Sequence, residues 1–351
     1  MEQLPQQLVN GLWQGGALAL FAMGYTLVFG SLDVVNLAHG ATYMLGAYIG
    51  LMMVTKLGLP FWAALPAAML AGGLIAVLLD LLAFKPLRAL TYGGLVLWAG
   101  FLVLLFGLAG PWEQQTKIGM SGVGAIIMAV GIVLDYRAVS PIRTQQVPPL
   151  APMISSIGAS IIMISLAQGI FGNQVSRFPP AALPIMPYIL PGGVVIAPIQ
   201  LLVLALSLAL IVGLHLLLTR TAIGRAIRAI AWSTRTSRLL GINVDLVVGQ
   251  TFFLSGALAG AAGALLGLAF NRLDPLMGNE VELAGLTVII VGGMGSVAGA
   301  AVAAFLVGML RVMSVAYIDS SFRDAFVFAL LIAVLLVRPS GLFGRARAVR
   351  A

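Results

Sequence analysis

The residues able to do bond chemistry are few and widely spaced in this sequence. It holds two histidines, His39 and His215, no cysteine, and 11 carboxylates scattered between apolar runs. This pattern offers neither a metal site nor a catalytic triad, and without cysteine disulfides and thiolate-bound metals are excluded. No GxxxxGK[ST] loop is present either, so any ATP must be bound by partner subunits. The sequence therefore predicts no enzyme and no cofactor of its own.

Polar residues embedded in apolar sequence are the first candidates for a function. Asp33, Asn36 and His39 lie between two apolar runs in GSLDVVNLAHGATYM. Polar backbone at membrane depth is tolerated only where it is buried in protein or lines a wet cavity. One interpretation is a broken helix whose Asn36 and His39 face a substrate path. The other is an interfacial loop in which His39 caps a helix.

A glycine-rich stretch interrupts a second apolar run. VGGMGSVAG, at 291–299, could present free backbone N–H and C=O groups to a ligand, as the half-helices of transporters do. The alternative is a flexible re-entrant turn without ligand contact. On the functional interpretation of both stretches, we assign the substrate pathway to Asn36, His39, Gly40, Gly292, Gly293, Gly295 and Ser296.

The long polar segment at 219–245, TRTAIGRAIRAIAWSTRTSRLLGINVD, is strongly basic. It has no acid before Asp245, and apolar runs flank it on both sides. Clustered basic residues in a short loop indicate the cytoplasmic face. Helical spacing predicts a short helix with a basic side, ended by Gly241 as a C-terminal cap. Such a helix suits the docking of a soluble partner, and we assign this coupling role to Arg225, Arg228, Arg235, Leu240 and Gly241.

Composition identifies an integral membrane protein. The 351 residues are 61% hydrophobic and only 9% charged, against about 25% charged in soluble domains. We predict an all-α, polytopic chain forming a single transmembrane domain over 1–351, with about ten membrane helices of about 20 apolar residues and short re-entrant or broken helices. The candidate spans are 8–30, 41–55, 60–83, 93–110, 118–134, 150–171, 197–218, 246–270 and 323–337, with an interrupted run at 284–313.

Glycines at helical spacing predict close helix packing. In LSGALAGAAGALLG, at 254–267, Gly256 and Gly260, and then Gly263 and Gly267, recur at i,i+4. Small residues at this spacing let helix backbones approach one another in a membrane. We interpret this face as architecture rather than chemistry.

Loop charges predict the orientation in the membrane. Basic loops at 84–88, 135–146, 219–245 and 338–351 are expected in the cytoplasm. Both the arginine loop and the C-terminal tail lie inside only if 284–313 crosses an even number of times, so we interpret it as two short helices meeting at the glycines. The same parity places the N-terminus outside. The acids then expected in solvated outer loops are Glu113, Asp274, Glu280, Glu282, Asp319 and Asp324.

Three stretches taken together resemble the permease subunits of branched-chain (hydrophobic) amino acid ABC importers. They are GYTLVFGSLDVVNLAHGATYMLGAY, then GRAIRAIAWSTRTSRLLGIN, then GLTVIIVGGMGSVAGAAVAAFLVG with FALLIAVLLVRPSGLFG. The likeness covers 8–88 and 140–344 and favours the type with an NLAHG block near the N-terminus. It implies a multi-pass subunit of the bacterial plasma (inner) membrane that moves a branched-chain or other hydrophobic amino acid inward.

The resemblance also implies partners. These are a homologous second permease subunit, two cytoplasmic ATP-binding subunits, a periplasmic or extracellular solute-binding protein, and membrane lipid. No nucleic acid is expected, because the basic residues lie in the loops assigned to the cytoplasm. The arginine loop ends in the LLGIN of the family, which implies that it is the coupling helix that meets an ATPase.

The sequence departs from the family pattern in two places. Residues 89–139 add two apolar segments where the family has a short link, and FKPLR at 84–88 and SPIR at 140–143 both resemble the single P-[LI]-R motif found there. Trp232 and Ser233 replace a polar, frequently acidic pair in the family's cytoplasmic loop. The second departure bears on which ATPase surface the loop recognises.

Other transport functions are alternatives to the import of amino acids by an ABC importer. Similar permeases serve urea, short amides and aromatic acids. A different class, the ion-coupled secondary transporters, would need carboxylates embedded in the membrane. The candidates in this sequence are Asp33 and Asp80.

The predicted orientation can be tested with single cysteines, because the chain has none of its own. In sealed, right-side-out cells a membrane-impermeant maleimide should label Asp319→Cys but neither Arg235→Cys nor Arg347→Cys. Labelling at 235 or 347 before the cells are permeabilised would overturn the orientation.

Overall fold

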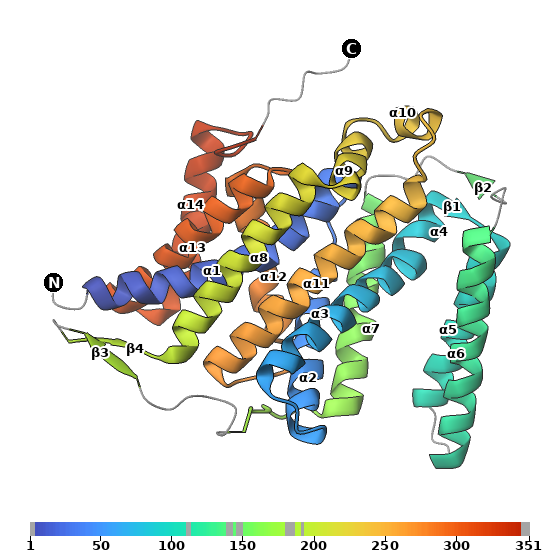
Figure 1. The fold of residues 1–351 in the computed structure, drawn as a ribbon, viewed down its shortest axis with the longest axis horizontal. Coiled ribbons are helices and arrows are strands. Elements are labelled where there is room, and N and C mark those ends of the chain that lie inside the picture. The colour runs from blue at the N-terminus through green and yellow to red at the C-terminus, as the bar shows by residue number, and fades with distance from the viewer. Residues whose placement is uncertain are drawn as a thin grey trace. The chain divides into compact units, whose positions relative to one another are not determined.

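The computed structural model describes residues 4–109, 114–137, 143–144, 150–179, 187–190 and 193–344. These residues are almost wholly helical, as Figure 1 shows. The chain divides into two compact units, of which the first comprises Met1–Val77 with Ser160–Ala351 and the second Leu78–Ala159. The second unit contains the predicted spans 93–110 and 118–134.

The first unit holds most of the helices. Its short strands β3 (Tyr188–Leu190) and β4 (Val194–Ile196) pair antiparallel, with Ile189 opposite Val195. Helices α3 (Phe61–Leu79) and α7 (Leu150–Phe171) each begin in one unit and end in the other. The elements are α1 (Leu4–Leu32), α2 (His39–Lys56), α3 (Phe61–Leu79), α7 (Leu150–Phe171), β3 (Tyr188–Leu190), β4 (Val194–Ile196), α8 (Pro198–Arg220), α9 (Ala222–Trp232), α10 (Thr234–Leu239), α11 (Val244–Phe270), α12 (Met277–Gly292), α13 (Val297–Tyr317), the 3-10 turn η3 (Ser320–Phe322) and α14 (Arg323–Val337).

The second unit is a helical hairpin on a short base. A π-helical turn, η1 (Asp80–Phe84), leads into α4 (Lys85–Arg88) and strand β1 (Ala89–Leu90). α5 (Tyr92–Ala109) and α6 (Gln114–Arg137) then pack against each other along their length. β2 (Arg143–Thr144) pairs antiparallel with β1.

The predicted fold class is confirmed. Eight helices in the described part of the chain are long and apolar enough to cross a membrane, and the predicted spans 150–171 and 323–337 coincide with α7 and α14. α2 and α12 are shorter or more polar than these. The run 284–313 forms the C-terminal part of α12 and most of α13, joined at the glycines.

Helix α1 is the centre of the first unit. It packs against α8, α11, α12 and α13 and is buried along most of its length. Gly11 and Gly15 allow α13 to approach, since a Cβ on Gly15 would lie 2.8 Å from the Cα of Phe305. The close packing of α1 follows from small residues on the faces that it presents to its neighbours.

The glycine face predicted on α11 does bring helices together. A Cβ on Gly46 of α2, or on Gly260 of α11, would meet backbone atoms of the facing helix closer than any real contact. Gly256 faces Gly72 of α3 in the same way, and Gly263 faces the carbonyl of Tyr43. α2 and α3 therefore both pack on α11 at backbone contact.

The two ends of the first unit can be distinguished by its connections. The side chain of Gln6, at the start of α1, exchanges hydrogen bonds of 2.9 and 2.7 Å with the backbone of Val195 in β4. From β4, α8 runs to α9 and α10, and α11 returns, as Figure 1 shows. The start of α1 and the end of α11 therefore lie at the end of the unit away from α9 and α10.

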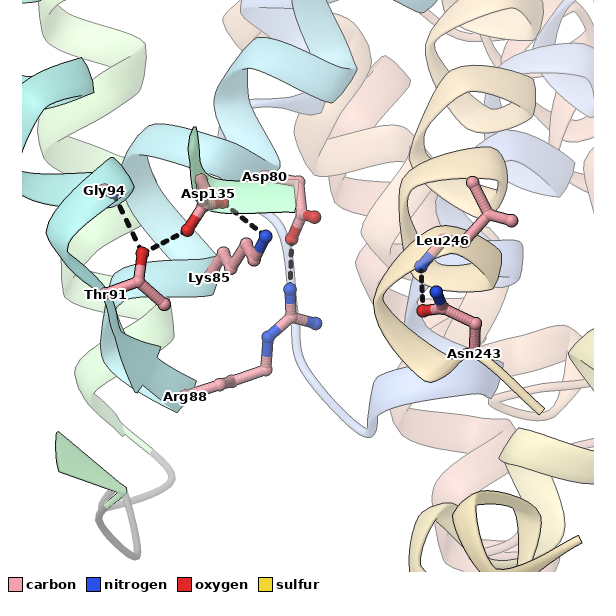
Figure 2. Close-up of polar contacts among 8 residues, drawn as sticks. All are labelled: Asp80, Lys85, Arg88, Thr91, Gly94, Asp135, Asn243 and Leu246. Carbon is pink, nitrogen blue, oxygen red and sulfur yellow. Dashed lines mark hydrogen bonds and ion pairs between the residues drawn. The ribbon is translucent and has the colours of Figure 1, made fainter. Parts of the chain in front are cut away.

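Charged residues at the base of the second unit are buried and paired. The Lys85 ammonium donates to Oδ2 of Asp135, and the Thr91 hydroxyl donates to Oδ1 of the same carboxylate (Figure 2). Arg88 donates to Asp80 over 2.6 Å. A buried charge is tolerated when its partner and hydrogen bonds are both present, so this cluster ties α4 to the end of α6.

Removing one member of the Lys85–Asp135 pair should destabilise the chain. Lys85→Met leaves a buried unpaired carboxylate and should lower the free energy of unfolding by about 3–5 kcal/mol. Adding Asp135→Leu should recover most of that loss, because an apolar pair needs no compensating charge. Thermal unfolding of the full chain in detergent measures both changes.

Arg238→Met, at an exposed arginine of α10, is the control and should cost less than about 1 kcal/mol. A double variant as unstable as Lys85→Met alone would show that charge pairing does not hold the cluster.

Candidate functional site

The segment between α1 and α2 is a turn built by Asn36. α1 ends at Leu32, and Asp33 adopts a left-handed backbone with φ of 57°. The Asn36 side-chain oxygen accepts from the Ala38 N–H at 3.1 Å, while the Asn36 carbonyl accepts from the His39 N–H at 3.2 Å. An asparagine that bonds the backbone two residues ahead is a common turn former. Asn36 is buried and starts α2 at His39.

His39 joins three helices inside the first unit. Its ring stacks on Tyr25 with centroids 5.3 Å apart and lies 4.6 Å from the ring of Phe21, both on α1. Nε2 lies 3.1 Å from the Phe21 carbonyl oxygen, and Nδ1 lies 3.4 Å from Oγ of Ser255 on α11. Because the carbonyl can only accept, Nε2 carries the proton and Nδ1 accepts from the serine hydroxyl. Both ring nitrogens are thus used in packing α1, α2 and α11.

Glu282 is a functional candidate that sequence reasoning missed. We expected it in a solvated outer loop, and this is wrong, because its side chain lies inside the helix packing and the residue is only 8% exposed. Its Oε2 accepts from the Gly40 N–H at 2.7 Å. The first N–H groups of a helix lack partners within it and favour a negative charge. Glu282 of α12 therefore caps the buried start of α2.

Glycines make this cap possible. A Cβ on Gly40 would lie 2.5 Å from Oε2 of Glu282 and from the carbonyl oxygen of Gly278. Gly278 and Glu282 are one turn apart on α12, so the same helix face supplies both the space and the carboxylate. That i,i+4 spacing next to an apolar run was the signal in the sequence that could have identified Glu282.

Two polar atoms beside this cap have no hydrogen-bond partner. They are Oε1 of Glu282 and the hydroxyl of Tyr25, which are buried and close enough to interact electrostatically without forming a hydrogen bond of good geometry. Buried polar atoms without partners are uncommon in folded proteins. The Tyr25 hydroxyl is therefore a donor that lies near the second oxygen of this carboxylate.

The glycine-rich turn packs against a different part of α1 from the part that His39 contacts. Gly293 and Gly295 have φ of 100° and 86°, which favours glycine, and Ser296 caps α13 by accepting from the Gly299 N–H at 3.1 Å. Gly295 packs on Gly30, near the end of α1, whereas His39 lies beside Phe21. Nine helical residues separate those levels by about 14 Å.

The C-terminal segment covers part of that turn. The N–H groups of Leu342 and Phe343 donate to the carbonyls of Val291 and Gly292 at 2.8 and 3.0 Å. These are two of the backbone acceptors that a helix end leaves free. The predicted pathway residues thus form two groups. Asn36, His39 and Gly40 lie at the start of α2, where it packs against α1, α11 and α12. The other group lies beside the C-terminal segment and comprises Gly292, Gly293, Gly295 and Ser296.

The arginine loop forms two helices rather than one. Thr221 caps α9 by accepting from Gly224 N–H at 3.1 Å, and Ser233 caps α10 by accepting from Thr236 N–H at 3.2 Å. The break follows from Ser233, whose extended backbone ends α9. Gly241, with φ of 80°, follows α10 as the sequence predicts, and its N–H donates to the Arg238 carbonyl.

α9 and α10 present a surface that is both basic and apolar. Ile227 and Ile230 are buried against the rest of the first unit. The exposed residues are three arginines, Arg225, Arg228 and Arg235, and three large apolar residues. The apolar residues are Trp232 (79% exposed), Leu239 (81%) and Leu240 (75%). Leu239 and Leu240 are exposed because α10 starts anew after the break at Ser233 and does not continue the buried face of α9. We call these six residues the α9–α10 surface.

The fold and these features define a multi-pass membrane protein, and comparison with known proteins gives its family. Residues 7–335 match the family described as "Branched-chain amino acid transport system / permease component", and the chain belongs to that family. It is a family of transport proteins rather than enzymes. Among the described residues, no three His, Cys, Asp or Glu side chains converge as metal ligands.

Individual relatives cover most of the chain. It is 30% identical over 350 residues to the high-affinity branched-chain amino acid transport system permease protein BraD of Pseudomonas aeruginosa, covering 97% of this chain and 95% of that protein. LivH of Escherichia coli (strain K12), with the same description, is 30% identical over 355 residues, with the same coverage. The xylose transport system permease protein XylH of Escherichia coli (strain K12) is 37% identical over 114 residues, 31% of this chain and 29% of that protein.

The Glu282 cap can be tested by separating its hydrogen bond from its charge. Glu282→Leu leaves the buried Gly40 N–H without an acceptor and should cost about 1–3 kcal/mol of stability. Glu282→Gln keeps an acceptor and should fold and transport nearly as the parent does. Thermal unfolding and uptake into proteoliposomes of the assembled transporter measure the two effects.

For the stability measurement, Glu280→Leu is the matched control, because Glu280 is exposed on the same helix and the variant should lose less than about 1 kcal/mol. Full stability with abolished uptake in Glu282→Gln would instead indicate that Glu282 carries a proton or ion.

Proposed function

We propose that this chain is the permease subunit of an ABC importer that moves branched-chain or other hydrophobic amino acids inward across a bacterial inner membrane. ATP is bound and hydrolysed by two cytoplasmic subunits, and a solute-binding protein delivers the amino acid. A homologous second permease subunit completes the membrane part. The family match and the relatives BraD and LivH, similar along 97% of the chain, support this proposal.

The α9–α10 surface is the observation that carries the proposal. Its arginines are exposed beside large apolar side chains, a combination that suits a protein interface better than a lipid or water interface. α9 packs on α1, α8 and α11, so a force on α9 reaches the helices that meet at His39 and Glu282. In the proposed importer, closure of the ATPases moves α9 and α10 and changes which side of the membrane the pathway faces.

The predicted pathway residues act here by setting helix positions. His39 and Gly40 fix α2 to α1 and α12, and Ser296 fixes the start of α13. We propose that transport alters these contacts and so opens a path along α1. The residues 89–139 are proposed as an addition to the permease domain that leaves this path intact.

For the substrate class, other candidates compete with branched-chain amino acids. XylH is similar over 31% of the chain, so a sugar is a second candidate alongside urea, short amides and aromatic acids. The longer matches to BraD and LivH favour amino acids. The alternative of an ion-coupled transporter needs a buried carboxylate, and Glu282 is one. However, Glu282 already accepts a hydrogen bond from the Gly40 N–H, and Asp80 is paired with Arg88, so neither carboxylate favours that alternative.

Charge reversal on the α9–α10 surface tests the coupling role. Arg228→Glu should weaken association with the ATPases or uncouple ATP hydrolysis from uptake, because an acid on the ATPase would then meet a like charge. Reversal is chosen because truncating an exposed arginine costs less than about 1 kcal/mol. Co-purification and proteoliposome uptake of leucine measure the effect, and an acid-to-base change on the ATPase should restore transport.

Arg177→Glu, at an exposed arginine before β3, is the matched control and should leave association unchanged. Normal uptake by Arg228→Glu with stoichiometric ATPases bound would show that the loop serves only membrane orientation.

A further inference from the structure

The first unit contains a cavity at the end away from α9 and α10. Its volume is about 340 Å³, within the range of small-molecule sites. α1, α2, α11, α12, α13 and α14 all contribute to its wall, with the loop after Phe270. Four of these helices, α1, α2, α11 and α12, also converge on His39 and Glu282, and the cavity lies at the ends nearer the solute-binding side in the proposed importer.

One wall of this cavity is apolar. Leu18 of α1 and Leu266 of α11 are buried there, and Met277 and Val281 of α12 complete the patch. Aliphatic side chains of this kind accept an aliphatic group by burial, at roughly 25 cal/mol per Å² of apolar surface removed from water.

Charged side chains of both signs also line this cavity. Arg311 of α13 projects from an apolar helix, and its side chain is only 16% exposed. Glu280 of α12 and Asp274 of the preceding loop supply carboxylates that also line the cavity. Such a lining can meet an anionic and a cationic group of one ligand at the same time.

Two guanidinium groups at this cavity share one carboxylate. Arg311 donates to Asp324 at 3.2 Å, and Arg323 is 3.5 Å from the same carboxylate oxygen. Arg323 lies 3.6 Å from Glu280. Each guanidinium has five N–H donors, so two of them sharing Asp324 keep donors for a further carboxylate.

We propose that this cavity binds a zwitterionic amino acid with an aliphatic side chain. The carboxylate of the ligand accepts from Arg311, its ammonium group donates to Glu280 or Asp274, and its side chain packs on Leu18 and Leu266. The inference rests on the proposed import of amino acids and adds a substrate site on the permease itself, distinct from the one on the solute-binding protein.

Direct binding to the purified full chain tests this without any ATPase. L-leucine, L-leucinamide, which lacks the carboxylate, and 4-methylpentanoate, which lacks the ammonium group, are titrated by calorimetry in detergent. The parent chain should bind leucine more tightly than either analogue. Arg311→Met should weaken leucine binding ~10-fold or more and remove the preference over leucinamide, because the charge-assisted hydrogen bonds are lost.

Glu280→Gln is the second test variant, for the case that Arg311→Met fails to fold. It should fold normally because the Glu280 side chain is 68% exposed. It should weaken leucine but leave 4-methylpentanoate unchanged. Arg238→Met, at an exposed arginine of α10 at the other end of the first unit, is the control. Equal binding of the three compounds to the parent chain, or no leucine binding at tens of millimolar, would overturn the inference.

The same variants distinguish this failure from failure of the proposed function. If the assembled transporter takes up leucine while the isolated chain shows no leucine binding, the cavity is not a substrate site and the importer proposal stands. If Arg311→Met weakens only docking of the solute-binding protein, the charges serve that interface and the inference falls. If leucine is neither bound nor transported, both proposals fall.

Discussion

The first unit depends on satisfying the start of α2, which begins beside the middle of α1. A helix start has free N–H groups, and in apolar surroundings water cannot supply their acceptors. Glu282 supplies one by reaching from α12, and Asn36 builds the turn that brings the chain back to this depth. The carboxylate in turn is tolerated because it meets the positive end of the α2 dipole. Each group therefore compensates the other.

This mutual compensation requires backbones in contact, and so it explains where the glycines lie. Gly40 and Gly278 face each other at the cap, and Gly46 meets Gly260 two turns further along. Helices in lipid gain little from burying apolar surface against each other, so close van der Waals contact and interhelical hydrogen bonds must hold them. His39 adds such bonds on the α1 and α11 side. The polar and the glycine contacts are parts of one packing arrangement.

The helices could be predicted from the sequence because apolar length is a local property. α7 and α14 follow directly from it, and the end of the arginine-loop helix follows from the residue type at Gly241. The burial of Glu282 could not, because it depends on α2 returning into the bundle, a contact between residues 242 positions apart. The break at Ser233 was missed for a related reason: helical periodicity continues across it, and only the competing cap of α10 ends α9.

Helix α11 connects the two surfaces to which functions are proposed. It begins beside α10, where Asn243 caps it by accepting from the Leu246 N–H at 3.1 Å (Figure 2), and it ends at Phe270 on the charged cavity. Backbone contacts with α2 and α3 keep it from bending independently of them. In the proposed importer, a displacement of α9–α10 is therefore transmitted by rigid movement of α11 rather than by a relay of side chains. Because Tyr43 and Gly267 both line the cavity, any slide of α11 past α2 also changes the cavity's shape.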